Sequence, residues 1–467
     1  MENLDTSSEN FRNKLSTVSE EGKRVWIYPK KPSGRFYNAR TIFSWFLLIF
    51  LFGAPFIKVN GHPFILLNLL EREFIIFGVP FGPHDFYIFL LGFIATIIFI
   101  FLFTAVYGRV FCGWACPQTV FLEMVFRKIE YFIEGDANKQ RQLDESPWNT
   151  EKILKKGSKN IIFFALSFLI SNVFLAYIIG VDELWKIVTD PPREHLAGLT
   201  AITFFSGAFY FVFAWFREQA CTIVCPYGRL QGVLLDKNSL VVAYDHVRGE
   251  PRGKLRKGEE NTNGDCIDCG LCVDVCPTGI DIRNGIQLEC VNCTACIDAC
   301  DNVMDKINKP RGLVRYASLN GIEQNLPFRL TPRIASYTFL LLLIVGVFSF
   351  FLITRADFSV NILRTPGMLY QEQPGNKVSN LYNLNVVNKT FDDVTFEVKV
   401  KNLPAEIKVL GNDYKLGPHG IYEGKFMVIL DKDKLTRMNT PIEMNVLSKG
   451  KEIASVKSTF LAQTGVK

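Results

Sequence analysis

The chain has 467 residues, of which 48% are hydrophobic and 13% aromatic, and its formal net charge is +6. This length and apolar content exclude a single ordinary soluble domain and point to membrane segments. The basic residues lie beside apolar runs and form no long polybasic face, which argues against nucleic acid as a partner.

Five apolar runs of spanning length follow a polar segment, residues 1–40, that does not have the pattern of a cleaved signal peptide. The sequence therefore predicts five membrane helices. The runs cover residues 41–57, 85–107, 160–180, 200–216 and 334–354. A shorter run, Phe64 to Leu70, cannot span a membrane and is expected to be a re-entrant or interfacial piece.

The distribution of Lys and Arg predicts the orientation of these helices. Eight of them lie in residues 1–40, two in 58–84, nine in 108–159 and two in 181–199. Because basic loops stay in the cytoplasm, residues 1–40, 108–159 and 217–333 are expected there. The resulting plan is a cytoplasmic segment 1–40, four helices within 41–216, a cytoplasmic segment 217–333, a fifth helix at 334–354 and an external domain at 355–467.

Two C-x-x-x-C-P motifs each follow a membrane span, with Cys112 and Cys116 in the first and Cys221 and Cys225 in the second. Their offset of 109 residues indicates a duplicated pair of helices and allows one four-thiol site or two separate sites at the membrane surface. Soft thiolates favour Cu(I), and such cysteines can also take up a cluster or form a redox-active disulfide. The plainer alternative is that they are small apolar packing residues at helix ends.

Pro117 and Pro226 suit the first position of a new helix, because proline has no amide hydrogen to lose there. The helix after Pro117 is expected to lie on the membrane surface, with Arg127, Lys128 and Glu130 away from its apolar face. The apolar positions of that face are Val120, Phe121, Met124, Val125, Ile129 and Phe132.

The electrostatic setting of the four motif cysteines predicts easy ionisation. A helix amino terminus and nearby cations such as Arg109 or Arg229 stabilise a thiolate. We therefore expect these thiols to be more ionised than ordinary buried cysteines.

The other eight cysteines form two C-x-x-C-x-x-C-x-x-x-C runs that begin 24 residues apart, in a ferredoxin segment at about residues 258–306. This spacing is the bacterial signature for two 4Fe-4S clusters, in which the fourth cysteine of each run binds the other cluster. The expected ligands are Cys266, Cys269, Cys272 and Cys300 for cluster 1, and Cys276, Cys290, Cys293 and Cys296 for cluster 2. Structural zinc is the alternative, but two complete runs exceed what one tetrahedral site needs.

The residues after Thr354 change character and contain no cysteine. Alternating apolar and polar residues, separated by Gly, Pro, Asn and Asp, predict a β-sandwich. The clearest strands are at 395–400, 422–430, 442–447 and 453–461. The absence of cysteine from this external part agrees with thiols that are kept in a reducing compartment.

Four sequence segments resemble the CcoG family of cytochrome c oxidase accessory proteins, also called FixG or RdxA. These are Gly-Arg-Val-Phe-Cys-Gly-Trp-Ala-Cys-Pro-Gln-Thr-Val at 108–120, Ile-Glu-Gly-Asp at 133–136, Cys-Pro-Tyr-Gly-Arg-Leu-Gln at 225–231 and Arg-Gly-Glu-Pro-Arg-Gly at 248–253. The resemblance extends over essentially the whole chain. C-x-x-x-C-P pairs with ferredoxin runs also occur in the membrane polyferredoxins of nitrate and nitrous oxide respiration.

The resemblance implies a bacterial inner-membrane protein with its amino terminus and clusters in the cytoplasm and an immunoglobulin-like domain in the periplasm. It also implies a cupric reductase that acts in assembly of the cbb-type haem-copper oxidase. Copper would be the substrate and copper chaperones the partners. A homodimer is the oligomeric state that we expect. Carried over by motif, the copper ligands are Cys112, Cys116, Cys221 and Cys225. The electron donor is left open, as a cytoplasmic or quinol carrier.

Two other functions agree with the sequence. The first is a quinol-linked electron-transfer subunit of a respiratory chain, without copper chemistry. The second is an oxidase-assembly scaffold whose β-sandwich binds oxidase subunits while the clusters serve structure only.

Overall fold

The structure is a computed structural model that describes residues 17–19, 21–69, 72–254, 263–324, 331–410, 414–435, 437–448 and 450–463, without the side chains of Glu73 and Arg229. The chain forms two compact units. Unit 1 consists of Met1–Lys58 with Leu91–Gly346, and unit 2 of Val59–Leu90 with Val347–Lys467.

Five helices in the described residues are long and apolar enough to cross a membrane, which is the number that the sequence predicts. They are α1 (Arg35–Gly53), α2 (Phe86–Tyr107), α7 (Thr150–Ile179), α9 (Leu196–Phe211) with its π-helical extension η5 (Val212–Phe216), and α15 (Pro332–Ile353). Helix α7 begins ten residues before the apolar run that the sequence shows. Asn149 caps this earlier start, because its side chain accepts a hydrogen bond from the Lys152 amide at 2.8 Å.

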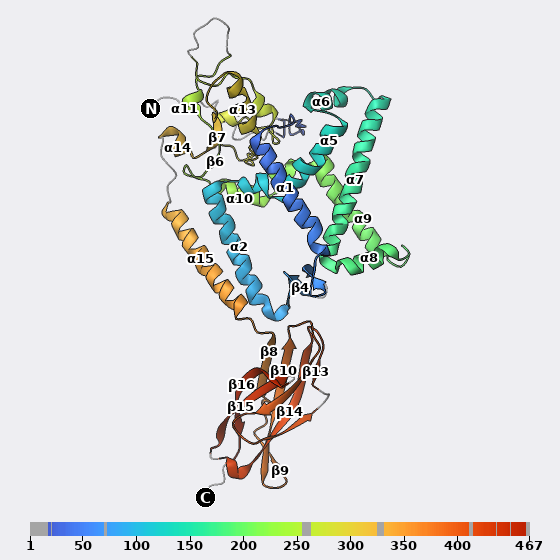
Figure 1. The fold of residues 1–467 in the computed structure, drawn as a ribbon, viewed down its shortest axis with the longest axis vertical. Coiled ribbons are helices and arrows are strands. Elements are labelled where there is room, and N and C mark those ends of the chain that lie inside the picture. Colours follow the sequence, from blue (N-terminus) through green and yellow to red (C-terminus); the bar gives the residue numbers. More distant parts are fainter. Residues whose placement is uncertain are drawn as a thin grey trace. The chain divides into compact units, whose positions relative to one another are not determined.

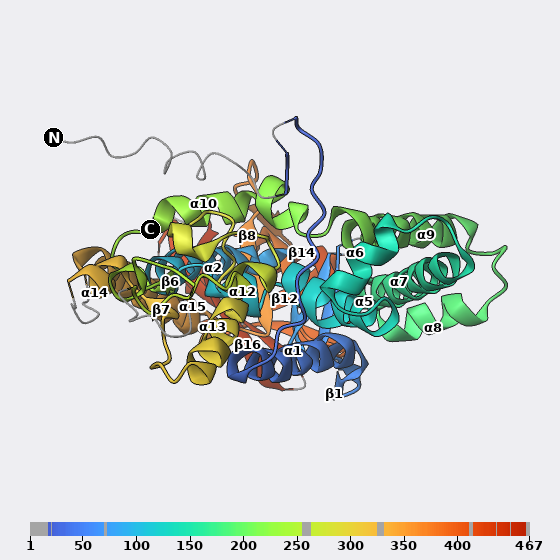
Figure 2. The same cartoon turned by 90° about the horizontal axis from the view of Figure 1, so that it is seen from above.

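An aromatic core joins α7 and α9, which run side by side (Figures 1 and 2). Phe126 stacks on Phe213 with ring centroids 4.9 Å apart and meets Phe163 edge-on at 4.8 Å. Leu48 of α1 belongs to the same buried cluster. Aromatic pairs of this kind stabilise a core beyond the area that they bury. The apolar window of α15, in contrast, is 0% buried, so its side chains are available to lipid.

The remaining elements of unit 1 are short and carry the cysteine motifs. The helices are η2 (Ala54–Phe56), α3 (Val110–Trp114), α4 (Pro117–Thr119), η4 (Val120–Phe126), α5 (Arg127–Ile133), α6 (Ala137–Glu145), α8 (Val181–Thr189), η6 (Ala220–Val224), α10 (Pro226–Leu234), α11 (His246–Gly249), α12 (Leu271–Asp274), η7 (Ile282–Asn284), α13 (Ala295–Lys306) and α14 (Leu319–Glu323). Strands β6 (Val241–Tyr244) and β7 (Val314–Ala317) pair antiparallel.

The helices that begin at Pro117 and Pro226 are confirmed, but the charged residues expected away from the apolar face of the first one do not all face solvent. Arg127 is only 1% exposed, whereas Phe132 of the expected apolar face is 90% exposed. The reason is the π-helical stretch η4, which changes the angular step between residues and so turns α5 relative to a regular α-helix. Glu130 is buried as well.

The amino end of α1 is held by a residue of α13. The carboxylate of Asp298 accepts hydrogen bonds from the backbone amides of Phe36, at 3.1 Å, and Tyr37, at 2.8 Å. Gly34 lies so close that an added Cβ would stand 2.3 Å from Cγ of Asp298. Asp298 therefore satisfies amide groups that a helix terminus leaves without partners.

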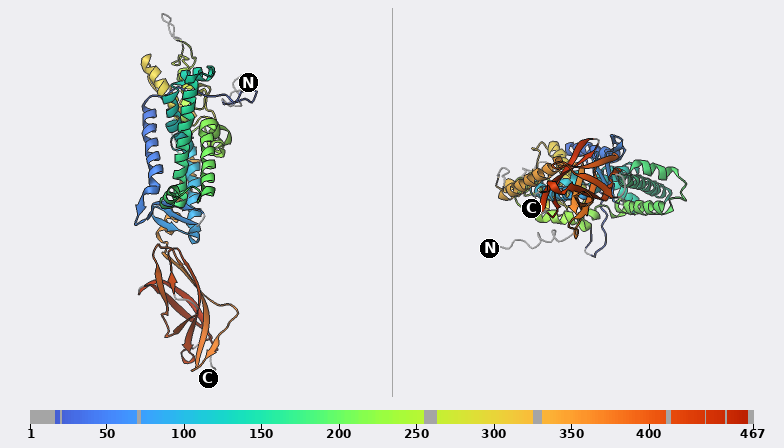
Figure 3. Two further views of the ribbon diagram at one scale, coloured as in Figure 1. Left: turned by 90° about the vertical axis from the view of Figure 1, so that its right-hand side faces the viewer. Right: turned by 90° about the horizontal axis from the view of Figure 1, so that it is seen from below.

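Unit 2 contains a β-sandwich, whose two layers are seen in Figure 3. Its strands are β8 (Phe358–Arg364), β9 (Gln371–Gln373), β10 (Lys377–Asn388), β11 (Val394–Val400), β12 (Glu406–Leu410), β13 (Lys415–Leu416), β14 (Ile421–Asp431), β15 (Asn439–Ser448) and β16 (Lys451–Leu461), with a 3-10 turn, η8 (Lys432–Lys434). One sheet has the order β12-β14-β10-β8, with β9 beside β10, and the other has the order β13-β11-β15-β16. The four strands expected from sequence correspond to β11, β14, β15 and β16.

The sandwich core is fully buried and includes a hydrogen bond between the sheets. Tyr382 of β10 and Phe426 of β14 stack with ring centroids 5.6 Å apart, and both are inaccessible to solvent. The Tyr382 hydroxyl donates to the Thr459 carbonyl of β16 at 2.9 Å. A buried hydroxyl thus has its partner, which avoids the cost of an unsatisfied polar group.

The short run from Phe64 to Leu70, which the sequence suggested as a re-entrant or interfacial piece, forms part of a small antiparallel sheet. Residues Ile65–Asn68 form strand β3, which pairs with β4 (Glu73–Ile76), and β4 pairs with β5 (Val79–Phe81). Leu70 lies outside the described residues. Strands β1 (Lys58–Val59) and β2 (His62–Pro63) and a 3-10 turn, η3 (Pro83–Asp85), flank this sheet in the chain.

Substitution of Phe426 tests the sandwich core. Phe426→Ala should destabilise the domain by about 3–5 kcal/mol, because it removes a fully buried ring and leaves a cavity. Thermal unfolding of the full chain in detergent measures the effect, and Lys425→Ala, on an exposed neighbour in β14, is the control. Equal transitions for the two variants would contradict the assigned core.

Candidate functional site

Eight cysteines line two neighbouring cavities in unit 1. The first cavity is lined by Cys266, Cys269, Cys272 and Cys300 together with apolar side chains. The second cavity is lined by Cys276, Cys290, Cys293 and Cys296, and also by Cys272. All twelve cysteines of the chain are free thiols. The cysteines are therefore divided between the two cavities in the way that the crossed ligand pattern requires.

The two cysteine runs adopt the same backbone conformation. Asp268 and Asn292, at equivalent places in the two runs, have positive φ values of 50° and 54°, and Gly270 and Thr294 follow with 70° and 68°. Asp, Asn and Gly tolerate this left-handed region, whereas the β-branched Thr294 is unusual in it. These turns bend each loop around its cavity, so the duplication seen in the sequence extends to the backbone.

The cavities are apolar enough to disfavour free thiolates. Burial raises the pKa of the Cys272, Cys290 and Cys300 thiols to about 12, and neighbouring cysteines add to this effect. A coordinated metal has the opposite effect and deprotonates a thiol. The geometry and the donor set of both cavities therefore fit 4Fe-4S clusters.

The two C-x-x-x-C-P motifs lie close to each other in the structure. The Cys221 thiol lies close enough to those of Cys112, Cys116 and Cys225 for each of them to raise its pKa. Gln231, a fully buried residue of α10, links the motifs directly: its Oε1 accepts a hydrogen bond from the Cys112 thiol at 2.9 Å. The structure therefore places the two motifs beside each other, which is the arrangement that a single four-thiol site requires.

The expectation of easily ionised motif cysteines is wrong for two of them. Burial raises the pKa of the Cys112 thiol, and Arg109 opposes this only in part. Burial, together with the other three thiols, raises the pKa of Cys221 to about 12. Desolvation of the charged form outweighs the single cation, which sequence reasoning could not weigh. The side chain of Arg229 lies outside the described residues.

The first motif packs directly against the second cavity. A Cβ added to Gly113, between Cys112 and Cys116, would lie 2.5 Å from the carbonyl oxygen of Val291 and 2.9 Å from the carbonyl oxygen of Asn292. Val291 and Asn292 separate two of the cysteines that line the second cavity, and Cys112 shares a buried apolar cluster with Val291. Only glycine allows this approach between the two loops.

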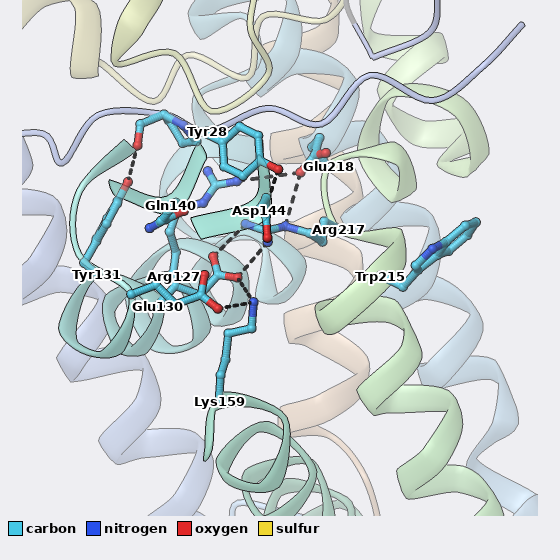
Figure 4. Close-up of polar contacts among 12 residues, drawn as sticks. Tyr28, Arg127, Glu130, Tyr131, Gln140, Asp144, Lys159, Trp215, Arg217 and Glu218 are labelled. Atoms are coloured by element: carbon cyan, nitrogen blue, oxygen red, sulfur yellow. Dashed lines mark hydrogen bonds and ion pairs between the residues drawn. The ribbon is translucent and has the colours of Figure 1, made fainter. Parts of the chain in front are cut away.

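A buried network of charged side chains lies between the segments that follow Cys116 and precede Cys221 (Figure 4). Arg217 donates two hydrogen bonds of 2.8 Å to the carboxylate of Glu130, and Lys159 lies 3.5 Å from the same group. Burial by itself would raise the pKa of Glu130, but Arg217 and Lys159 outweigh it and lower the pKa to about 2. Arg127 and Arg217 each lie 3.6 Å from Glu218.

This network connects the two C-x-x-x-C-P motifs. Glu130 belongs to the helical segment that follows Cys116, whereas Arg217 and Glu218 directly precede η6, which carries Cys221. The bidentate ion pair therefore fixes the distance between elements that are far apart in the sequence. No residue of this network was recognised from sequence as part of the site, although charged residues beside apolar runs are a signal for such a role.

Family models match three parts of the chain. A "4Fe-4S binding domain" matches residues 88–134, and a "4Fe-4S dicluster domain" matches residues 216–319. The immunoglobulin-like fold at the C-terminus of FixG matches residues 348–463. With the five apolar helices and the two cysteine-lined cavities, these matches define a membrane-bound iron-sulfur protein of the electron-transfer class.

Relatives extend over most of the chain. Protein RdxB of Cereibacter sphaeroides is 37% identical over 82% of this chain and 83% of its own length, and protein RdxA of the same organism is 34% identical over 81% and 82%. The nitrogen fixation protein FixG of Rhizobium meliloti is 36% identical over 65% of this chain and 59% of its own length. The chain belongs to the FixG family.

Removal of one charge from the network tests its role. Glu130→Gln should destabilise unit 1 by about 3–5 kcal/mol, because the buried Arg217 loses the carboxylate with which it makes a bidentate pair and keeps only the more distant Glu218. The control is Glu151→Gln, which breaks an exposed i,i+4 pair with Lys155 and should change the unfolding temperature little.

The difference in stability between the unsubstituted chain and Glu130→Gln is expected to depend on pH. The pKa of Glu130 is lowered from 4.5 to about 2 in the folded state, so its stabilisation is complete above pH 4.5 and is lost as the pH falls toward 2. The difference in unfolding temperature between the unsubstituted chain and Glu130→Gln should stay constant from about pH 5 to 8 and shrink in acid. A difference that grows in acid would contradict the ion pair.

Proposed function

We propose that this protein reduces Cu(II) to Cu(I) at the four-thiol site and supplies Cu(I) for assembly of a cbb-type haem-copper oxidase. Each Cu(II) ion accepts one electron. The residues that would hold copper are Cys112, Cys116, Cys221 and Cys225, and the hydrogen bond from the Cys112 thiol to Gln231 supports their assignment to a single site. Thiolates are soft ligands and stabilise Cu(I) over Cu(II), so the site itself favours the reduced product.

The eight cysteines of the cavities are assigned as cluster ligands in two sets. Cys266, Cys269, Cys272 and Cys300 would hold the first cluster, and Cys276, Cys290, Cys293 and Cys296 the second. When bound, such clusters supply reversible one-electron transfer. The protein contributes the apolar surroundings and the turns that bring each set of thiols to one cavity.

The observation that carries the proposal is the close packing of Gly113 on the backbone between Cys290 and Cys293. This contact puts the thiol site next to the second cavity, with no other chain segment between Gly113 and Val291. A site for a soft metal beside a one-electron carrier is the arrangement that a metal-ion reductase needs.

The cellular arrangement is part of the proposal. The excess of Lys and Arg in residues 1–40 and 108–159 favours a cytoplasmic position for the clusters and the thiol site in a bacterial inner membrane. The β-sandwich would then lie in the periplasm. Cu(I) would pass to copper chaperones, electrons would come from a cytoplasmic or quinol donor, and a homodimer is the assembly that we expect.

Removal of one thiol from each motif tests the site of copper reduction. The protein is reduced under anaerobic conditions, excess reductant is removed, Cu(II) is added, and Cu(I) is captured by a chelator while cluster absorbance is followed. Cys112→Ser with Cys221→Ser should reduce Cu(I) production to the background rate with cluster spectra unchanged, because both pairs lose a thiolate ligand. Val224→Ala, an exposed position between Cys221 and Cys225, is the control.

The same assay separates the proposal from its alternatives. Reduced clusters that are indifferent to Cu(II) but are reoxidised by quinone would overturn copper reduction in favour of quinol-linked electron transfer. Clusters that react with neither would favour the assembly scaffold.

Gly113→Ala tests the contact between the thiol site and the second cavity. The added methyl group forces the two loops apart, so Cu(I) production should slow about 10- to 100-fold, as is typical when reacting groups are misplaced. Electron paramagnetic resonance of the reduced clusters checks that both are still bound. The matched control is Gly157→Ala in α7, where a Cβ meets nothing within 4 Å. An unchanged rate with Gly113→Ala would contradict the role of this contact.

A further inference from the structure

A polar cavity lies within unit 2, which contains no cysteine. It has a volume of about 170 Å³ and is lined by Arg72, His84, Asp85, Arg355, Lys389 and His419 among others. This is room for several water molecules or for one small polar group. Polar cavities of this size in proteins hold water or a ligand, because dry cavities are apolar.

The described side chains of this cavity carry an excess of positive charge. Asp85, whose side chain is 1% exposed, accepts hydrogen bonds from Arg355 at 2.9 and 3.1 Å and from Lys389 at 2.6 Å. The side chains of Arg355 and Lys389 are only 8% and 11% exposed. Two buried cations thus share one carboxylate, and Arg72 adds a third positive charge where the cavity meets solvent.

This imbalance is costly without a further anion. A buried charge is tolerated when it is paired and hydrogen-bonded, and an uncompensated one destabilises the fold. Asp85 is the acidic residue among the described side chains that line the cavity. Both Arg355, through its planar fork of N–H groups, and Lys389, through its ammonium group, can still donate to an oxyanion in the cavity.

The cavity lies where two membrane helices begin and end. Asp85 directly precedes α2, and Arg355 follows the last residue of α15, Ile353, by two positions. Both helices are long and apolar enough to span a membrane. Residues that flank such spans lie at the level of the lipid headgroups, whose phosphate groups a basic pocket at that level can contact.

We propose that this cavity binds a phosphate group through Arg355 and Lys389, with Arg72 at its rim. Two sources offer this chemistry, the headgroup of a phospholipid and free phosphate. The bound group would complete the charge balance of Asp85, Arg355 and Lys389. The site takes no part in the copper chemistry proposed above and stands independently of it.

Titration of the delipidated full chain in detergent tests this proposal. The three probes are inorganic phosphate, a short-chain phosphatidylglycerol and the matching diacylglycerol without phosphate, and native mass spectrometry measures the bound fraction. Lys389→Met should weaken binding of the phosphate-bearing probe about 10- to 100-fold, because a charged donor to the phosphate is lost. Lys399→Met, on an exposed lysine of the same sandwich, should bind like the unsubstituted chain.

Comparison of the three probes shows whether the bound phosphate group belongs to a phospholipid headgroup or to free phosphate. Saturation by phosphatidylglycerol alone identifies a lipid headgroup, and equal saturation by inorganic phosphate identifies a free anion. Equal binding of the phosphate-free diacylglycerol, or unchanged binding by Lys389→Met, would overturn the site.

A variant at the rim of the cavity controls for the case in which Lys389→Met alters the folding of the chain. Arg72 is exposed, so Arg72→Gln should leave the unfolding temperature unchanged while weakening phosphate binding several-fold. If both Arg72→Gln and Lys389→Met bind the probe like the unsubstituted chain, the cavity does not recognise phosphate.

Discussion

The bidentate ion pair between Arg217 and Glu130 is the interaction on which the arrangement of the thiol site depends. Cys116 and Cys225 are 109 residues apart in the sequence, and each motif sits on its own short helical segment. Two hydrogen bonds of 2.8 Å between buried charges tie these segments together beside the cysteines. Such a pair contributes little net stability when compared with apolar packing, but it tolerates very few alternative geometries.

With the motifs held together, the cysteine sites have a linear order. Cys272 lines both cavities, so the first cavity adjoins the second. Gly113 packs on the loop of the second cavity, which therefore also adjoins the four-thiol site. The second cavity is the central member of the series. An electron carrier placed there would lie next to both neighbours.

Much of this organisation could be predicted from sequence, because it depends on local pattern. Apolar run length identified five helices, and cysteine spacing divided the ligands between two cavities. The misses depend on tertiary context. The π-helical stretch η4 turned Arg127 and Glu130 into the core, and burial outweighed Arg109 at Cys112. Neither a helical register shift nor the extent of desolvation is visible in residue spacing.

The position of Asp298 has a consequence for biogenesis. Helix α1 is synthesised well before α13, and the carboxylate that caps it belongs to a residue made more than 260 positions later. Asp298 also lies between two cysteines of the second run. The amino end of α1 therefore receives this cap only after the cysteine-bearing segment has folded against it.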